Sequence, residues 1–126
     1  MTAELQPFVW QVGRDQITAY AEASGDRNPI HLDDAAARAA GLPGVIAHGM
    51  LGMAQLANFV VAYAGDHRRL RRLRCRFSGM VLPGDTITFT GRVVGEEEGL
   101  VRLELDAANQ KGERVLTKAL AELEAG

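Results

Sequence analysis

The sequence predicts an α+β domain in which a curved antiparallel sheet folds around one long helix. Between Gly49 and Ala64 only Gln55 and Asn58 are strongly polar, and a helix that is apolar on nearly all sides is buried on most of them. From Arg69 onward the apolar residues recur at every second position, as in strands with one buried face. The helix needs a surface to pack against and the sheet needs a cover. A sheet wrapped around a helix at about 49–64 satisfies both needs.

Shorter elements are expected before the long helix. Gly25 can take the left-handed conformation that ends a helix, and Asp33 and Asp34 can cap the start of another. Two glycines and a proline in residues 41–44 require a loop. The expected elements are a strand at 8–10, a helix between Gly13 and Gly25, and a short helix at 35–40.

The second half of the chain is predicted to form an antiparallel meander. Its apolar and polar residues alternate, as in strands with one face in the core and one face in solvent. The expected strands are 69–77, 86–93, 101–106 and 115–123, with turns or loops at 83–85, 95–99 and 109–112.

Length and composition limit the classes of function. A chain of 126 residues forms a single domain, here 1–126. A net charge of −2 gives no basis for nucleic acid as a partner. The N-terminus lacks the pattern of a secretory signal, and the long helix is shorter than the about 20 apolar residues of a membrane span. Cys75 alone forms no internal disulfide. We therefore expect a cytoplasmic protein that binds no membrane.

The segment from Gly25 to His31 carries an acid, an amide and an imidazole within six positions. In a helix, Asp26 and His31 would point about 140° apart. Pro29 disfavours the helical conformation at Asn28, so an irregular turn is expected, which can direct both side chains at one point. A carboxylate and an imidazole arranged in this way can act as general base and general acid.

A simple turn is the alternative interpretation, because Asp and Asn bond their own backbone in many turns. The start of the long helix favours a site instead. Unpaired amides at a helix N-terminus stabilise negative charge, and Gly49 would let a ligand come close to the backbone. The three histidines lack the spacing of a metal site, so no metal is expected.

These segments resemble the signature of a known family. Residues 20–31 read YAEASGDRNPIH, and they are followed by Gly41 and by IAHGM at 46–50. Together with Arg76-Phe77 and LPGDT at 82–86, this pattern resembles the MaoC-type dehydratases, the (R)-specific enoyl-thioester hydratases of the hot-dog fold. The resemblance spans nearly the whole chain. It implies a hot-dog fold and a dimer whose two sheets join edge to edge.

The resemblance also implies a hydro-lyase that adds water to trans-2-enoyl thioesters or removes it from (R)-3-hydroxyacyl thioesters. It makes Asp26 and His31 the catalytic pair and gives Asn28 the role of orienting water or supporting the pair. Because of its place at the start of the long helix, we expect the Gly49 N–H to bind the thioester oxygen. Coenzyme A or phosphopantetheine would enter only as part of an acyl-CoA or acyl-carrier-protein substrate, with no other cofactor. Further substrate contacts are expected at Pro29, Ile46, Ala47, His48 and Met50. For His48 we expect a hydrogen bond that supports the turn rather than direct catalysis.

Six arginines lie between Arg68 and Arg76 in a chain that is acidic overall. Two interpretations remain open for Arg72, Arg74 and Arg76. They can form a solvated strand face, or they can bind the phosphates of coenzyme A or an acidic carrier protein.

Two alternative functions also remain open. One is a catalytic or non-catalytic subunit of a heterodimeric dehydratase, in place of a homodimer. The other is a hot-dog thioesterase, which would need a carboxylate on the long helix, where the sequence has none. The sequence does not specify the length of the acyl chain.

Overall fold

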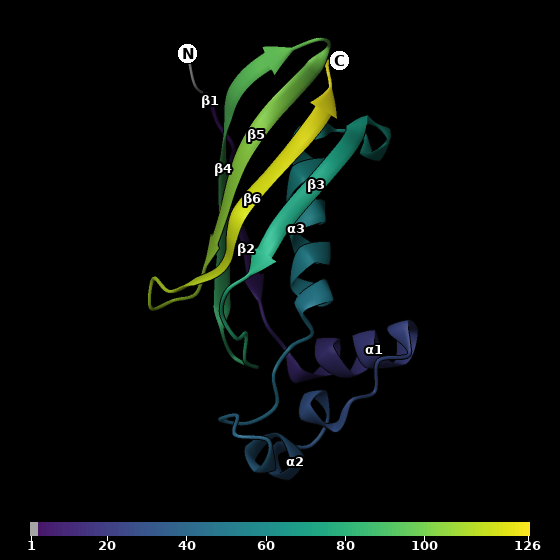
Figure 1. Ribbon diagram of the computed structural model, residues 1–126, viewed down its shortest axis with the longest axis vertical. Coiled ribbons are helices and arrows are strands. Elements are labelled where there is room, and N and C mark those ends of the chain that lie inside the picture. Colours follow the sequence, from purple (N-terminus) through teal and green to yellow (C-terminus); the bar gives the residue numbers. More distant parts are fainter. Residues whose placement is uncertain (1–2) are drawn as a thin grey trace.

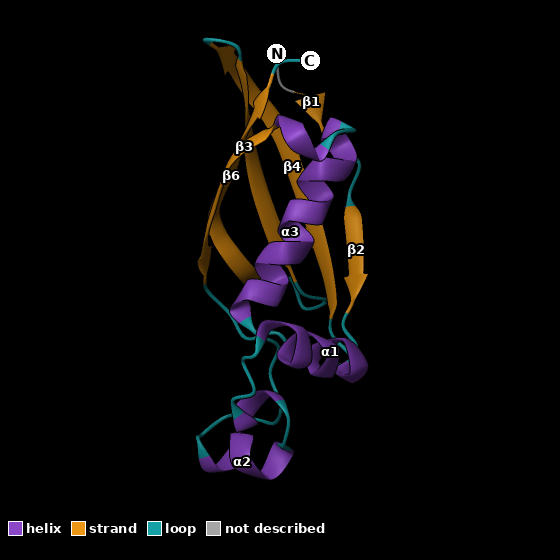
Figure 2. Cartoon of the chain, turned by 90° about the vertical axis from the view of Figure 1, so that its right-hand side faces the viewer, coloured by secondary structure: helices purple, strands orange, loops and turns teal. Residues whose placement is uncertain are grey.

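The long helix α3 spans Gly49–Ala64, as predicted, in the computed structural model, which describes residues 3–126 (Figure 1). It ends at Gly65, whose φ of 80° is left-handed. Leu56, Phe59 and Val60 on this helix are at most 2% exposed. Burial of each such side chain contributes about 1.5–3 kcal/mol. The helix therefore forms the centre of the hydrophobic core, and Figure 2 shows it lying along one face of the sheet.

The sheet is antiparallel and has the strand order β1-β4-β5-β6-β3, with β2 also paired to β4. Its strands are β1 (Ala3–Glu4), β2 (Phe8–Gln11), β3 (Leu70–Phe77), β4 (Thr86–Glu97), β5 (Leu100–Ala108) and β6 (Arg114–Glu124). A helix on one face of a curved antiparallel sheet confirms the α+β, hot-dog prediction.

The meander prediction is confirmed for β4, β5 and β6 but is wrong for β3. That strand pairs with β6 at the far edge of the sheet, not with β4, the next strand along the chain. Alternating polarity determines which face of a strand is buried. It carries no information on which strand lies beside it, so the pattern could not predict this pairing.

The loop predicted at 95–99 is shorter in the structure. Strand β4 continues to Glu97, and the turn is made by Glu98 and Gly99, both with positive φ. The register of β4 against β5 shifts between Val93 and Gly95. Such a bulge breaks the period of two, which is why the alternating pattern ends before the strand does.

The core lies between α3 and the inner face of the sheet. The rings of Phe8, Phe59 and Phe89 form a cluster with centroids 5.8 to 6.5 Å apart. Gly91 on β4 leaves room for the side chain of Leu105 on the neighbouring strand β5, because a Cβ at this position would lie 2.9 Å from it.

Two short helices lie beyond the N-terminal end of α3 (Figure 2). Helix α1 (Arg14–Ser24) ends at Gly25, with φ of 80°, and α2 (Asp34–Ala39) is capped by the Asp33 carboxylate on the Ala35 N–H. The carboxylate of Asp34 accepts hydrogen bonds from the Arg14 guanidinium and the Val45 N–H. This residue therefore ties both helices to the segment that enters α3. Two single-turn 3₁₀ helices, η1 (Pro29–His31) and η2 (His67–Arg69), complete the described elements.

Candidate active site

The turn between α1 and η1 is held by its own polar side chains. The Asp26 N–H donates to Ser24 Oγ at 3.2 Å, and the Asn28 N–H donates to Asp26 Oδ1 at 3.3 Å. Asn28 Oδ1 accepts from the Ile30 N–H at 3.2 Å and so caps η1. The expected irregular turn is present. Its hydrogen bonds engage one carboxylate oxygen of Asp26 and leave Oδ2 free to face another group.

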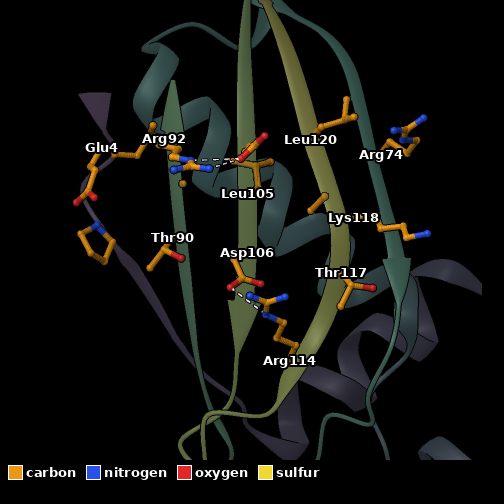
Figure 3. A pocket seen from close by; sticks show the side chains of 15 residues that line it. Glu4, Arg74, Thr90, Arg92, Leu105, Asp106, Arg114, Thr117, Lys118 and Leu120 are labelled. Carbon is orange, nitrogen blue, oxygen red and sulfur yellow. Dashed lines mark hydrogen bonds and ion pairs between the residues drawn. The ribbon is translucent and has the colours of Figure 1, made fainter. Parts of the chain in front are cut away.

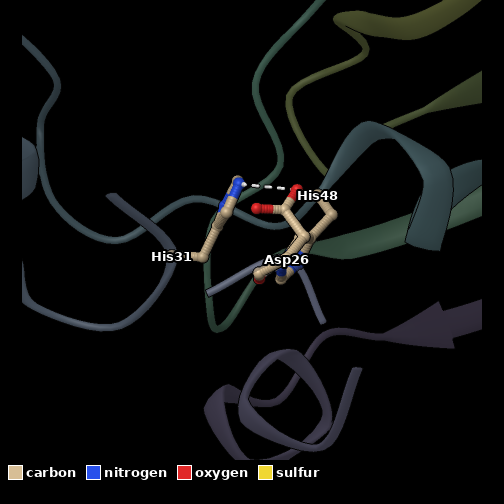
Figure 4. A group of neighbouring side chains, drawn as sticks. All are labelled: Asp26, His31 and His48. Atoms are coloured by element: carbon tan, nitrogen blue, oxygen red, sulfur yellow. Dashed lines mark hydrogen bonds and ion pairs between the residues drawn. The ribbon is translucent and has the colours of Figure 1, made fainter. Parts of the chain in front are cut away.

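His31 faces that oxygen. Its Nε2 lies 4.0 Å from Asp26 Oδ2 (Figure 4). Its Nδ1 lies 2.7 Å from the carbonyl oxygen of Ile46, which can only accept, so Nδ1 carries the hydrogen. The His31 side chain is 9% exposed, whereas that of Asp26 is 55% exposed. The structure therefore places a buried imidazole of fixed orientation beside a carboxylate that water can reach.

His48 supports both members of this pair. Its Nε2–H donates to the backbone oxygen of Asp26 at 2.9 Å, and its ring stacks on that of His31 with centroids 3.7 Å apart. The edge-on ring of Tyr20 contacts it, with a centroid distance of 4.8 Å. The expected hydrogen bond to the turn is present, but the stacking was not anticipated. His48 Nδ1 is buried, without a hydrogen-bond partner in residues 3–126.

Asp26, His31 and His48 bring three potential metal ligands close together. Potential ligand atoms of the three side chains lie within 4.8 Å of one another. Each imidazole donates one ring N–H to a backbone carbonyl, which leaves His31 Nε2 and His48 Nδ1 with a lone pair. The expectation that no metal binds stays a prediction.

Gly49 opens α3 next to this cluster. Its N–H makes no hydrogen bond to residues 3–126, as is usual for the first amides of a helix. A Cβ at this position would lie 3.2 to 3.3 Å from three ring atoms of Phe77. The glycine therefore lets the Phe77 ring lie against the helix start.

A mostly apolar cavity of about 170 Å³ adjoins the helix start. Of the predicted contact residues, Ile46, Ala47 and His48 line it, together with Gly49. Pro29 and Met50 are exposed and do not line it. The strands contribute apolar side chains that the sequence had not pointed to, because only the folded sheet brings them to the helix: Ile87, Phe89, Val115 and Leu116.

The predicted arginines do not lie at this cavity. Arg72 and Arg74 pair in register with Glu122 and Leu120 of β6, and cross-strand partners project from the same face of a sheet. Arg72 lies 3.8 Å from the Glu122 carboxylate. Arg74 lines a groove of about 740 Å³ on the outer face of the sheet, the face turned away from α3 (Figure 3). Arg76 is exposed, without an ion-pair partner in the described part of the chain.

The outer groove has charges of both signs. Arg92 pairs with Glu104 at 2.8 Å and Arg114 with Asp106 at 3.4 Å (Figure 3). Within each pair the two opposite charges neutralise one another. Among the cations that line the groove, only Arg74 and Lys118 lack an ion-pair partner within residues 3–126.

The protein is a hot-dog domain with a carboxylate and an imidazole close together near the start of its central helix. Comparison with known proteins identifies its family. The model of the MaoC like domain family matches residues 4–113. The chain therefore belongs to the MaoC-like dehydratase family. This confirms the resemblance noted in the sequence.

Several relatives and solved structures are similar to this chain. The fatty acid synthase beta subunit TOXC of Cochliobolus carbonum is 41% identical over 101 residues, and the fatty acid synthase subunit beta of Saccharomyces cerevisiae is 36% identical over 100 residues. Each match covers 78% of this chain but only 5% of the relative. The chain thus spans about a twentieth of the length of these curated relatives.

Two solved structures extend over nearly all of the chain. One is a MaoC-like dehydratase, with a TM-score of 0.94 and 30% identity, covering 100% of this chain and 40% of the other. Another is the (R)-hydratase PhaJ1 of Pseudomonas aeruginosa, with a TM-score of 0.82 and 29% identity. This match covers 99% of the present chain and 79% of the other. No helix in residues 3–126 is long and apolar enough to span a membrane.

Proposed function

We propose that this domain catalyses the (R)-specific hydration of trans-2-enoyl thioesters and the reverse dehydration of (R)-3-hydroxyacyl thioesters. The observation that carries this proposal is the approach of Asp26 Oδ2 to His31 Nε2 beside the free amide of Gly49. Membership of the MaoC-like family and the similarity to an (R)-hydratase support it.

In the proposed hydration, Asp26 accepts a proton from water, and the water oxygen forms a bond to Cβ of the substrate. The electron pair of the double bond moves toward the thioester, whose oxygen gains negative charge and accepts a hydrogen bond from the Gly49 N–H. Cα then takes a proton from Nε2 of the His31 imidazolium, whose Nδ1–H stays on the Ile46 carbonyl.

After one turnover Asp26 holds a proton and His31 has lost one. At 4.0 Å the two atoms are too far apart for a direct hydrogen bond, so one bridging water molecule returns the proton. In dehydration the same steps run backward. Asn28 contributes by capping the turn that holds the pair, because its side-chain oxygen is engaged by the Ile30 N–H.

The substrate is an acyl-CoA or an acyl-carrier-protein thioester, and the enzyme works as a homodimer or with a second hot-dog subunit. The edge of β3 that faces away from β6 pairs with no strand of residues 3–126. An open edge of this kind can accept a strand from a second subunit. A thioesterase is less well supported, since α3 offers no carboxylate to the cavity.

Purified protein is tested with crotonyl-CoA by following the loss of absorbance of the conjugated thioester. We expect Asp26→Asn and His31→Ala each to lower kcat by at least about 10²-fold, the usual range for a lost general acid or base. Asp33→Asn, on the exposed cap of α2, is the matched control and should keep the wild-type rate. A fully active His31→Ala variant would exclude His31 from the mechanism, and release of free thiol would indicate hydrolysis instead.

A further inference from the structure

We propose that the charges on β3 prevent a second copy of this chain from pairing with it, and that Arg74 and Arg76 select a partner strand with carboxylates on its outer face. This inference depends on the second subunit of the proposed function but not on the reaction. Within residues 3–126, β3 pairs with β6 alone. Its other side therefore presents backbone groups that can bind a further strand.

The two faces of β3 differ in chemistry. On the inner face, Leu73 and Cys75 pack against the core, and the Phe77 ring lies against the start of α3. A strand added at this edge extends both faces of the sheet, so it must be apolar on the side of α3. On the outer face it meets three exposed arginines, Arg72, Arg74 and Arg76.

A second copy would place arginines opposite arginines. Facing residues of an antiparallel pair project from the same side of the sheet, so a continuous apolar inner face requires outer residues to face outer residues. In a symmetric dimer the two β3 strands are related by a two-fold axis. With the axis at Leu73, Arg72 faces Arg74. With the axis at Arg74, that residue faces its own copy. With the axis at Cys75, Arg74 faces Arg76.

Carboxylates within the chain neutralise only part of this charge. Arg72 lies 3.8 Å from the Glu122 carboxylate, which Arg102 also contacts at 3.3 Å. Arg74 and Arg76 have no ion-pair partner in the part of the chain that the structure describes. Like charges directly opposite each other destabilise a pair of strands. The charge on β3 therefore opposes a homodimer through this edge.

The paired side of β3 shows which chemistry suits it. There β6 presents Glu122 and Glu124, and their carboxylates form ion pairs with two arginines of β3. The residues of β6 that alternate with these glutamates are buried in the core. A strand of the same pattern on the free side, apolar within and acidic without, would supply the carboxylates that Arg74 and Arg76 lack.

The test uses a charge-reversed form of this chain as the acidic partner. Arg74→Glu/Arg76→Glu keeps the apolar face of β3 and replaces two outer arginines by carboxylates. Wild type and variant are mixed in equal amounts, and native mass spectrometry separates the two homodimers from the mixed dimer by mass. Sedimentation velocity at about 0.05 M and about 0.5 M NaCl gives the dissociation constants.

At low salt we expect the mixed dimer to have a Kd at least about tenfold lower than that of either homodimer, because opposite charges then face each other across the seam. Added salt screens attraction and repulsion alike. It should therefore weaken the mixed dimer and strengthen the wild-type homodimer. These opposite responses to salt distinguish pairing by charge from pairing by the apolar face alone.

Two further variants serve as controls. Arg74→Gln/Arg76→Gln removes the repulsion, so its homodimer should be tighter than that of the wild type at low salt, even if the glutamate variant folds poorly. Arg38→Glu/Lys111→Glu changes the net charge equally, on α2 and in the turn between β5 and β6, and should show no preference for the mixed dimer.

A wild-type homodimer as tight as the mixed dimer at low salt would overturn the inference, and so would the absence of any mixed dimer. Pairing is measured without substrate. The expected pairing together with no turnover of crotonyl-CoA in any assembly would therefore contradict the proposed function alone.

Discussion

His48 is the residue whose role changes most between sequence and structure. Its position before a buried helix predicts a supporting hydrogen bond, and the structure adds a second contact, the stack on His31. One side chain thus holds the backbone of Asp26 and one face of the His31 ring. Since both contacts act on the proposed catalytic pair, His48 is a positioning residue for it. A displacement of about 1 Å at such a pair can cost about 10²-fold in rate.

We therefore expect His48→Ala to lower kcat for crotonyl-CoA by about tenfold or more. His48→Gln should recover part of the loss, because the glutamine Nε2 can still donate to the Asp26 carbonyl. The measurement is kcat for both variants, with circular dichroism to check the fold. Equal kcat values in the alanine and glutamine variants would contradict a role through this hydrogen bond.

At the scale of elements, Asp34 joins three segments that are separate in the sequence. The Val45 N–H and the Arg14 guanidinium both bond its carboxylate and hold the pKa of Asp34 below its usual range. A carboxyl group with a lowered pKa in the folded state stabilises the fold above the pKa of the unfolded chain. That contribution is lost as the pH falls through the folded-state pKa.

Asp34→Ala should therefore lower the free energy of unfolding at pH 7 and lower it less at pH 3. Denaturant unfolding of the wild type, Asp34→Ala, Arg14→Ala and the double variant at both pH values measures the coupling between the two side chains. The coupling should shrink at pH 3. A coupling energy that is the same at both pH values would show that the charge of Asp34 does not contribute.

Sequence reasoning predicted the elements better than the contacts between them. The bounds of α3, the end of α1 at Gly25 and the cap at Asp33 follow from local patterns, and the structure confirms each of them. Which strand pairs with β3 depends on the path of the chain after 78–85, and local propensity does not predict that path.

The same distinction between local patterns and contacts of distant segments applies to the site. The turn geometry that lets Asp26 face His31 follows from Gly25 and Pro29, which are close in sequence. The stack of His31 on His48, the Phe77 ring over Gly49 and the strand residues lining the cavity arise only when distant segments meet.

At the scale of the whole molecule, the sheet separates two environments. The cavity lies on the helix side, where His48 and Gly49 line it, whereas Arg74 lies in the groove on the outer side. Arg72 is engaged by Glu122, which Arg102 also contacts at 3.3 Å. Of the arginines proposed to bind an anion, Arg74 and Arg76 are therefore the ones without an ion-pair partner in residues 3–126. Reversing the charge of Arg74 can distinguish the anion-binding interpretation of these arginines from the solvated-face interpretation. The change breaks no ion pair observed in residues 3–126.

If Arg74 attracts the phosphates of coenzyme A or an acidic carrier protein, Arg74→Glu should raise KM for the thioester severalfold and leave kcat unchanged. The effect should diminish as salt is added, because attraction between exposed charges is screened over about 10 Å at 0.1 M ionic strength. Lys111→Glu changes the net charge equally but lies in the turn between β5 and β6, so it corrects for the charge of the molecule as a whole. Steady-state kinetics at low and high salt, with CoA and carrier-protein substrates, provide the measurement. An identical KM in the two variants would mean that the outer face is only a solvated surface, and that substrate recognition resides on the helix side of the sheet.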